Sequence, residues 1–134
     1  MDAVATFQAV IDRYLAACEA HNAAGCAAFY ATDGEVHSPF GPPAKGPAEI
    51  AAEHRRWFEE GEIDKTMVVI RAGSGGEPGY CLVRFVADVS GPEGGMERFR
   101  GTSLIVMERR TDGVWTIKLT SLNEAEKQGT DQDT

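Results

Sequence analysis

Hydrophobic residues in the first half of the chain recur at helical spacing. Between residues 3 and 20 the apolar side chains fall at every third or fourth position, which predicts an amphipathic helix. Asn22 is a suitable N-cap for a short second helix. Pro47 suits the first turn of a third helix, and Gly61 suits its end. The pattern therefore predicts three helices before the midpoint of the chain.

The pattern then changes to alternating polar and apolar positions. Segments rich in β-branched and aromatic residues predict strands at 65–72, 80–90, 97–110 and 114–123. Short glycine-rich links join them, which is typical of antiparallel neighbours. A further short strand is predicted at 35–39. Residues 39–46 (PFGPPAKG) are predicted to be irregular, because proline removes hydrogen-bond donors and glycine loosens the chain.

This order of elements predicts one α+β domain over residues 1–123. We expect a strongly bent antiparallel sheet with three N-terminal helices over one face, so that a cone with one open end lies between them. Alternation along the last strand is expected to put Ile117, Leu119, Ser121 and Asn123 on one face. Residues 124–134 are polar and are expected to form a flexible tail.

Composition narrows the class of partner. The 134 residues carry a net charge of −8, which argues against nucleic acid and an anionic membrane surface as partners. The sequence has no membrane-spanning run and no leader pattern, so a cytoplasmic location is expected. Cys18, Cys26 and Cys81 occupy apolar positions and are expected to be reduced thiols. The histidines are too scattered for a metal site, and no cofactor is expected.

Four short motifs follow one another in the first half of the chain: residues 13–17 (RYLAA), 29–34 (FYATDG), 38–42 (SPFGP) and 46–50 (GPAEI). With the strands that follow, they resemble the nuclear transport factor 2-like superfamily, and more closely its ketosteroid isomerase-like and SnoaL-like members. The resemblance implies a cystatin-like fold and a homodimer formed through the outer face of the sheet. It does not imply one activity, because the superfamily hosts isomerases, cyclases, hydrolases, dehydratases and non-catalytic adaptors.

Tyr14 is the first candidate catalytic residue. Ketosteroid isomerases have a tyrosine at this place in the first helix, and it donates a hydrogen bond to the developing enolate oxygen. The resemblance implies the same role for Tyr14, since a phenol in a dry pocket stabilises an oxyanion better than water does. The alternative is a core aromatic residue whose hydroxyl bonds to a backbone carbonyl or to water.

Ser38 departs from the ketosteroid isomerase pattern. In that family the catalytic aspartate directly precedes a proline, and here Ser38 precedes Pro39. A serine hydroxyl does not take a carbon-bound proton unaided. The second acid of the family is missing too, because residues 101–105 of the predicted strand contain no carboxylate. We therefore do not expect steroid isomerisation by the family mechanism, and Ser38 becomes a candidate ligand-binding residue.

His54 and His37 are the candidate bases in place of that aspartate. His54 is expected on the apolar face of the third helix with Trp57 and Phe58. Its role there is either a general base, a hydrogen-bond donor to a ligand, or an interior histidine whose hydrogen bonds are all made within the protein. His37 and Ser38 point to opposite sides of their strand. The resemblance turns Ser38 inward, and a register slip would turn His37 inward instead.

Aromatic and polar residues complete the candidate site. Tyr30, Phe40, Trp57, Phe58 and Asn123 are expected either to orient a flat ligand or to fill the core and rim. We expect a small, mostly apolar, oxygenated ligand with a steroid-, polyketide- or terpenoid-like ring system, and acid–base chemistry of the isomerase or lyase type. The alternative is a non-catalytic small-molecule-binding or dimerisation module, which the missing carboxylates favour.

Overall fold

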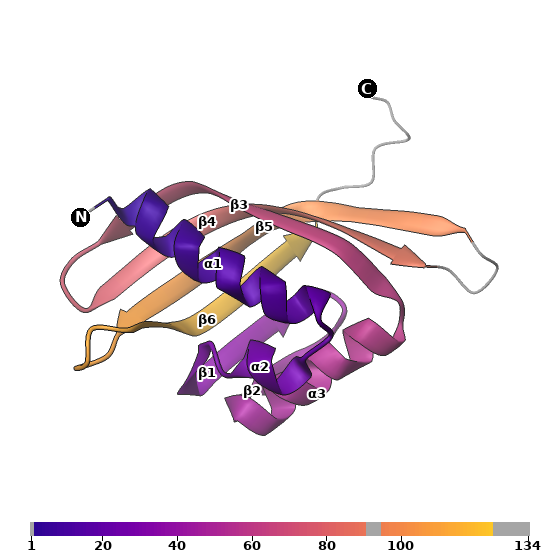
Figure 1. Ribbon diagram of the computed structural model, residues 1–134, viewed down its shortest axis with the longest axis horizontal. Coiled ribbons are helices and arrows are strands. Elements are labelled where there is room, and N and C mark those ends of the chain that lie inside the picture. Colours follow the sequence, from indigo (N-terminus) through magenta and orange to yellow (C-terminus); the bar gives the residue numbers. More distant parts are fainter. Residues whose placement is uncertain (1, 91–94, 125–134) are drawn as a thin grey trace.

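A computed structural model of the chain describes residues 2–90 and 95–124 (Figure 1). Its helices are α1 (Ala3–Glu19), α2 (Ala23–Ala27) and α3 (Gly46–Glu59). Its strands are β1 (Tyr30–Ser38), β2 (Gly41–Lys45), β3 (Glu62–Ser74), β4 (Pro78–Ser90), β5 (Met96–Arg109) and β6 (Trp115–Glu124). The predicted α+β class is confirmed. Glu124 ends β6, and the rest of the predicted tail lies outside the described residues.

The strands form one mixed sheet in the order β2-β1-β6-β5-β4-β3. β3 to β6 are consecutive antiparallel neighbours, as predicted. β1 runs parallel to β6, so the expectation of a wholly antiparallel sheet is wrong. A parallel pair needs a long connection between its strands, and here α3 and the following meander provide it. In Figure 1, α1 lies along the sheet beside β3, whereas α2 and α3 lie together near β1 and β2.

The proline-rich segment is a strand rather than the predicted irregular loop. β2 includes Pro42 and Pro43 and pairs with β1, with Ala44 opposite Val36. The segment tolerates prolines because β2 is the edge strand, where donors on the outer side need no partner in the sheet. β1 itself begins at Tyr30, earlier than the predicted residue 35.

A bulge in β6 reverses the predicted alternation of its side chains. Met107 of β5 pairs with Ile117, and the preceding residue, Val106, pairs with Leu119, so Lys118 is the extra residue. Ile117 and Thr120 are consequently both buried, although they are three positions apart. The expectation that Asn123 shares a face with Ile117 is wrong for this reason.

The helix boundaries follow the predicted signals. The Asn22 side chain accepts a hydrogen bond from the backbone nitrogen of Gly25 at 2.9 Å, which confirms Asn22 as the N-cap of α2. At the start of α3 the Glu49 carboxylate accepts from the backbone nitrogen of Lys45 at 2.8 Å. Gly61 follows α3 with φ of +97°, a conformation that glycine adopts without strain.

The core lies between the helices and the inner face of the sheet. Its largest fully buried apolar side chains are Phe7, Ile11, Ile50, Ile105, Met107 and Ile117. His54 is fully buried among them, and it is the one buried histidine among the described residues. A buried imidazole needs hydrogen-bond partners, and these partners determine which nitrogen of His54 carries the hydrogen.

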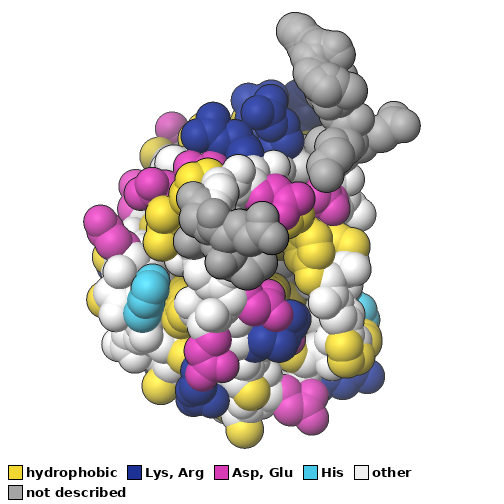
Figure 2. Space-filling model, turned by 90° about the vertical axis from the view of Figure 1, so that its right-hand side faces the viewer, with side chains coloured by type: hydrophobic (Ala, Val, Ile, Leu, Met, Phe, Trp, Pro, Cys, Tyr) yellow, Lys and Arg dark blue, Asp and Glu magenta, His cyan; other side chains and the backbone are white. Residues whose placement is uncertain are grey.

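The surface carries both signs of charge. On the face shown in Figure 2, lysine and arginine side chains gather along the upper edge, and acidic and hydrophobic side chains are scattered over the rest. Within the described residues, each helix is too short or too polar to cross a membrane.

Candidate functional site

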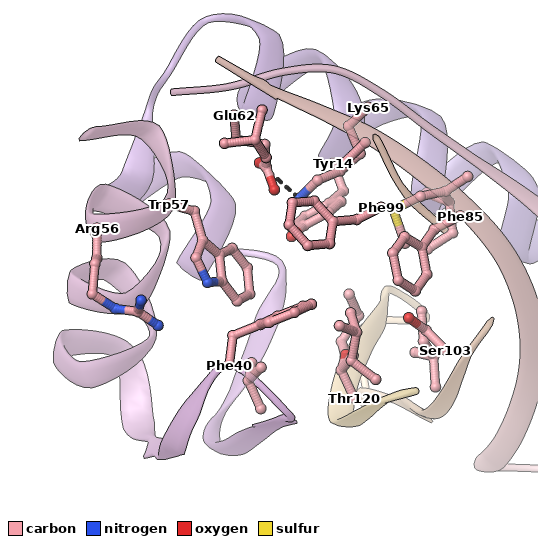
Figure 3. Close-up of a pocket in the computed structure, with 18 of the residues that line it drawn as sticks. Tyr14, Phe40, Arg56, Trp57, Glu62, Lys65, Phe85, Phe99, Ser103 and Thr120 are labelled. Carbon is pink, nitrogen blue, oxygen red and sulfur yellow. Dashed lines mark ion pairs between the residues drawn. The ribbon is translucent and has the colours of Figure 1, made fainter. Parts of the chain in front are cut away.

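A cavity of about 340 Å³ opens between α1, α3 and the inner face of the sheet (Figure 3). This volume lies in the range of small-molecule sites. Most of its wall is apolar or aromatic: Ile11, Val36, Trp57, Met67, Phe85, Ala87, Val89, Phe99, Ile105, Ile117 and Leu122. Among the lining residues only Phe40 and Glu60 are classed as exposed, so they mark the mouth. Phe40 meets Phe99 edge to face there, with ring centroids 5.5 Å apart.

Tyr14 and His54 form a buried hydrogen bond at the back of this site. The Tyr14 hydroxyl oxygen lies 2.5 Å from Nε2 of His54, and Nδ1 of His54 lies 2.8 Å from the carbonyl oxygen of Ile50. A carbonyl only accepts, so Nδ1 carries the hydrogen and donates. In a neutral imidazole Nε2 is then the acceptor, and Tyr14 must be the donor.

Burial keeps both groups neutral. Burial, with a smaller contribution from the charge of Lys65, lowers the pKa of His54 to about 4, although the hydrogen bond to Ile50 opposes the shift. Burial raises the pKa of Tyr14 well above its usual value of 10. At neutral pH the proton of Tyr14 is therefore directed at His54 and away from the cavity. Tyr14 is itself a lining residue of the cavity, and the oxygen of a hydroxyl that donates can still accept a hydrogen bond.

An ion pair lies beside Tyr14 at the same end of the cavity. Lys65 Nζ lies 3.0 Å from the Glu62 carboxylate, and both side chains are largely buried. The Lys65 ammonium also lies 5.1 Å from the centroid of a Trp57 ring and 5.8 Å from that of Tyr14. Cation–π contacts of this kind hold the ammonium between the two rings. The site thus contains a carboxylate and a cation that no pattern in the sequence predicted there.

Two buried polar atoms in the wall have no hydrogen-bond partner among the described residues. They are Nε1 of Trp57 on α3 and Oγ of Ser103 on β5. Both residues line the cavity, on opposite sides of it in Figure 3. An unpaired buried polar group is costly, by roughly 1–3 kcal/mol. The cavity therefore offers a ligand one N–H donor and one hydroxyl that can donate or accept.

Tyr30 and Thr120 provide a further polar group in the wall. Their hydroxyl oxygens lie 2.9 Å apart, and either can be the donor. Each hydroxyl has a single hydrogen, so the one that accepts keeps its own hydrogen free for another bond. Both residues line the cavity, which makes this pair a third contact point for an oxygenated ligand.

The structure brings some of the predicted site residues together and leaves others outside. Tyr14, Tyr30, Phe40 and Trp57 line the cavity, and His54 lies directly behind Tyr14. His37, Ser38, Phe58 and Asn123 are not among the lining residues.

Each of these four has a local explanation. His37 pairs with the Glu35 carboxylate at 2.8 Å on a half-exposed surface. Ser38 accepts a hydrogen bond from the backbone nitrogen of Phe40 at 3.0 Å, which shapes the turn after β1. Phe58 stacks on His21, with centroids 4.7 Å apart. Asn123 is exposed because of the bulge in β6.

Sequence reasoning missed several residues of the wall. Glu62 and Lys65 begin a strand directly after a glycine turn, and no motif marks them. Ser103 sits in the middle of an apolar strand, and its alternation with Ile105 does indicate the inner face. Thr120 could be placed on the inner face of the sheet only if the bulge in β6 were known.

The structure is an α+β fold with a cavity between the sheet and the helices. The SnoaL-like domain model matches residues 11–116, and the chain belongs to this family. No curated protein matches the sequence.

Solved structures share the fold at low sequence identity. A ketosteroid isomerase-like protein from Erwinia carotovora atroseptica aligns with a TM-score of 0.80 at 17% identity, over 92% of this chain and 96% of that one. An NTF2-like protein with a cystatin-like fold from Novosphingobium aromaticivorans gives 0.76 at 18% identity, over 92% and 82%. A nuclear transport factor 2-like superfamily protein from Salmonella enterica gives 0.73 at 14% identity, over 93% and 92%. At such identities the likeness shows the fold alone.

Proposed function

We propose that the chain binds a small, mostly apolar, oxygenated molecule in its cavity, with a steroid-, polyketide- or terpenoid-like ring system. The observation that carries this proposal is the pair of unpaired buried polar atoms, Trp57 Nε1 and Ser103 Oγ, in an otherwise aromatic and aliphatic wall. Apolar walls with a few placed polar groups are typical of small-molecule sites. A flat ring fits between the walls, and its oxygen atoms satisfy the two groups.

The two polar atoms determine how the ligand is oriented. Trp57 Nε1 only donates, so it requires a carbonyl or hydroxyl oxygen on the ligand. Ser103 Oγ accepts from a hydroxyl or donates to a second oxygen. A ligand with one oxygen chooses between them, and a ligand with oxygens at both ends uses both.

A comparison of matched probes tests the proposal. Naphthalene, 2-naphthol and 2-tetralone share a bicyclic frame and differ in the oxygen. We expect the two oxygenated probes to raise the thermal unfolding midpoint more than naphthalene does, since one hydrogen bond contributes about 1 kcal/mol, or roughly fivefold in affinity. Absence of stabilisation by all three probes would contradict the proposal.

The Tyr14–His54 hydrogen bond favours a second candidate function, acid–base catalysis. In this scheme the hydroxyl oxygen of Tyr14 takes a proton from a ligand carbon next to a carbonyl. Tyr14 passes its own proton to Nε2 of His54 in the same step, and the ligand becomes an enolate. The supporting observations are the 2.5 Å contact and the Lys65 cation near Tyr14, which stabilises developing negative charge.

Hydrogen–deuterium exchange of 2-tetralone in D₂O tests this chemistry directly, because exchange needs proton removal from carbon. We expect the chain to accelerate the exchange, and Tyr14→Phe to reduce the acceleration at least about tenfold. Glu62→Gln should retain it. Loss of exchange in Glu62→Gln with retention in Tyr14→Phe would assign the base to Glu62. Binding of 2-tetralone without any exchange would rule out this chemistry and favour a non-catalytic binding module.

We also propose that the chain forms a homodimer through the outer face of the sheet. Val68, Tyr80 and Leu104 lie on neighbouring strands and point away from the core, with exposed fractions of 53%, 46% and 41%. Arg84 lies opposite Val68 on the same face, so the apolar side chains share this surface with a cation. Exposed apolar side chains gathered on one face are typical of interaction surfaces. A second copy that presents the same face would cover them by two-fold symmetry.

A further inference from the structure

Two cysteines lie in contact beside the cavity. The sulfur atoms of Cys18 on α1 and Cys26 on α2 are 3.6 Å apart, and both residues are buried. A disulfide bond has a sulfur separation of about 2.05 Å. The two sulfurs therefore already face one another, and a bond between them needs only a small movement of the side chains.

The chain between the two cysteines is a short hydrogen-bonded connection. It passes from the end of α1 at Glu19 to the five-residue helix α2, which begins at Ala23. His21 lies between them with φ of +54°, in the left-handed region. The backbone nitrogens of His21 and Asn22 donate to the carbonyl oxygens of Cys18 and Ala17 at 2.9 and 3.0 Å, which holds α2 against the end of α1.

Cys18 is buried, with an exposed fraction of 5%, but it borders a hollow on the surface. This second hollow, of about 590 Å³, lies between α1 and the start of β3. The charged groups of this hollow include Lys65, Glu62 and Asp64. Cys26 is fully buried and does not line it. Within the pair, Cys18 is therefore the residue next to the hollow, and Cys26 lies on its inner side with the two sulfur atoms in contact.

The surroundings favour the reactive form of Cys18. The hydrogen bond from Cys26 lowers the pKa of Cys18 to about 7, and the charge of Lys65 contributes, against the effect of burial. A thiolate is the nucleophile in thiol oxidation, so a lowered pKa favours the reactive form of Cys18. The hydrogen bond to Cys18 and burial raise the pKa of Cys26, and burial raises that of Cys81 to about 12. Cys18 is therefore the thiol expected to react with the oxidant, and Cys81, outside the pair, is the internal reference.

We propose that Cys18 and Cys26 form an oxidisable thiol pair that closes reversibly to an intramolecular disulfide with hydroperoxides as oxidants. The Cys18 thiolate attacks one peroxide oxygen, the O–O bond breaks, and hydroxide leaves with the electron pair, so that Cys18 becomes a sulfenic acid. Cys26 gives up its proton and attacks the Cys18 sulfur, and the sulfenic oxygen leaves as water. Together, two thiols and one hydrogen peroxide yield one disulfide and two waters. An added dithiol reverses the reaction.

Mass spectrometry of the folded protein tests the proposal. The chain is treated with hydrogen peroxide in small molar excess, quenched, alkylated under denaturing conditions and digested. Trypsin leaves both cysteines in one peptide, residues 14–45, and puts Cys81 in another. We expect the first peptide to lose two hydrogen atoms and to escape alkylation, while Cys81 is alkylated fully. Treatment with dithiothreitol should restore both thiols.

Variants provide the controls. Cys81→Ser should still form the disulfide, whereas Cys26→Ser should stop at a Cys18 sulfenic acid or higher oxide. The unmodified chain carries the decisive result, so a variant that fails to fold does not weaken the test. Full alkylation of all three cysteines after peroxide treatment, over-oxidation of Cys18 without a disulfide, or a bond to Cys81 or to a second chain would each overturn the proposal.

Discussion

The hydroxyl of Tyr14 donates its hydrogen bond to Nε2 of His54 across 2.5 Å, although the two residues are 40 positions apart in the sequence. The carbonyl of Ile50 sets this direction, because it holds the proton on Nδ1. His54, a candidate base in the sequence, therefore accepts a hydrogen bond at Nε2 and donates one at Nδ1, so both ring nitrogens have partners. Tyr14 is the member of the pair that reaches the cavity.

Loss of this hydrogen bond should destabilise the fold. Tyr14→Phe leaves Nε2 of His54 buried and unpaired, so we expect the free energy of unfolding to fall by roughly 1–3 kcal/mol. His54→Asn removes the acceptor and should have a similar cost. In urea unfolding, the double variant should lose less than the sum of the two single variants, because they remove the same bond.

The matched control for that cycle is Tyr80→Phe, at a tyrosine with an exposed fraction of 46%. It should change the free energy of unfolding by less than about 0.5 kcal/mol. Strict additivity of Tyr14→Phe and His54→Asn would show that the two side chains do not interact in solution.

Stability should fall with pH between about 6.5 and 4. The unfolded chain binds a proton at His54 near its ordinary pKa of 6.5, whereas burial lowers the pKa in the folded chain to about 4. The stabilising contribution is therefore complete above pH 6.5 and is lost as the pH falls toward 4. The full loss amounts to about 3 kcal/mol, as an order of magnitude.

The measurement for this effect is urea unfolding at several pH values in the unmodified chain and in His54→Asn. The two proteins share every other ionisable group, so the difference between the two curves isolates His54. We expect the difference to shrink as the pH is lowered from 7 to 4.5. A difference that is independent of pH would contradict the burial of a neutral His54.

The sequence predicted the elements better than their faces. Alternation and turn residues located β3 to β6 within a few residues, because short antiparallel links leave little choice of partner. The pairing of β1 with β6 depends on a long-range contact that no local pattern encodes. The prolines of β2 led to the wrong prediction of an irregular loop for a related reason. A proline lacks a backbone N–H donor, and whether that donor is needed depends on the position of the strand in the sheet.

The candidate site shows the same division. Tyr14, Tyr30, Phe40 and Trp57 were predicted because they sit on apolar faces or in recognised motifs. Asn123 was misplaced because one extra residue, Lys118, turns the end of β6 over. The proximity of Glu62 and Lys65 to the cavity comes from the packing of β3 against α1, which a linear pattern does not contain.

Ser103→Ala should separate binding from folding. The hydroxyl of Ser103 is fully buried without a partner among the described residues, so its removal should leave the free energy of unfolding unchanged or raise it by up to about 1 kcal/mol. The same change should weaken binding of a probe with oxygens at both ends, such as 2,6-naphthalenediol, about fivefold, because such a probe uses both polar atoms of the wall. Calorimetric titration gives the affinities, and Ser121→Ala, in the part of β6 beyond the bulge and outside the cavity lining, is the matched control. A destabilised Ser103→Ala would mean that the hydroxyl has a partner in the protein.

The outer face of the sheet should control the oligomeric state. Light scattering of the unmodified chain at micromolar concentration should give twice the mass of one chain. Leu104→Glu places a charge at an apolar position with an exposed fraction of 41%, so we expect a monomer. Glu108→Lys, also exposed on β5 but outside the apolar patch, should remain a dimer. A monomeric unmodified chain would refute this interface.

Calorimetric titration of 2-naphthol into the unmodified chain and into a variant with a filled cavity tests the central claim most directly. Ala87 lines the cavity and is 4% exposed, so Ala87→Leu occupies the space that a ligand needs. Ala9→Leu, on the exposed side of α1, controls for the added side chain. We predict saturable binding with one site per chain in the unmodified protein and in Ala9→Leu, and its loss in Ala87→Leu with the fold intact by circular dichroism. Equal binding by all three proteins, or binding by none of them, would contradict a ligand site in this cavity.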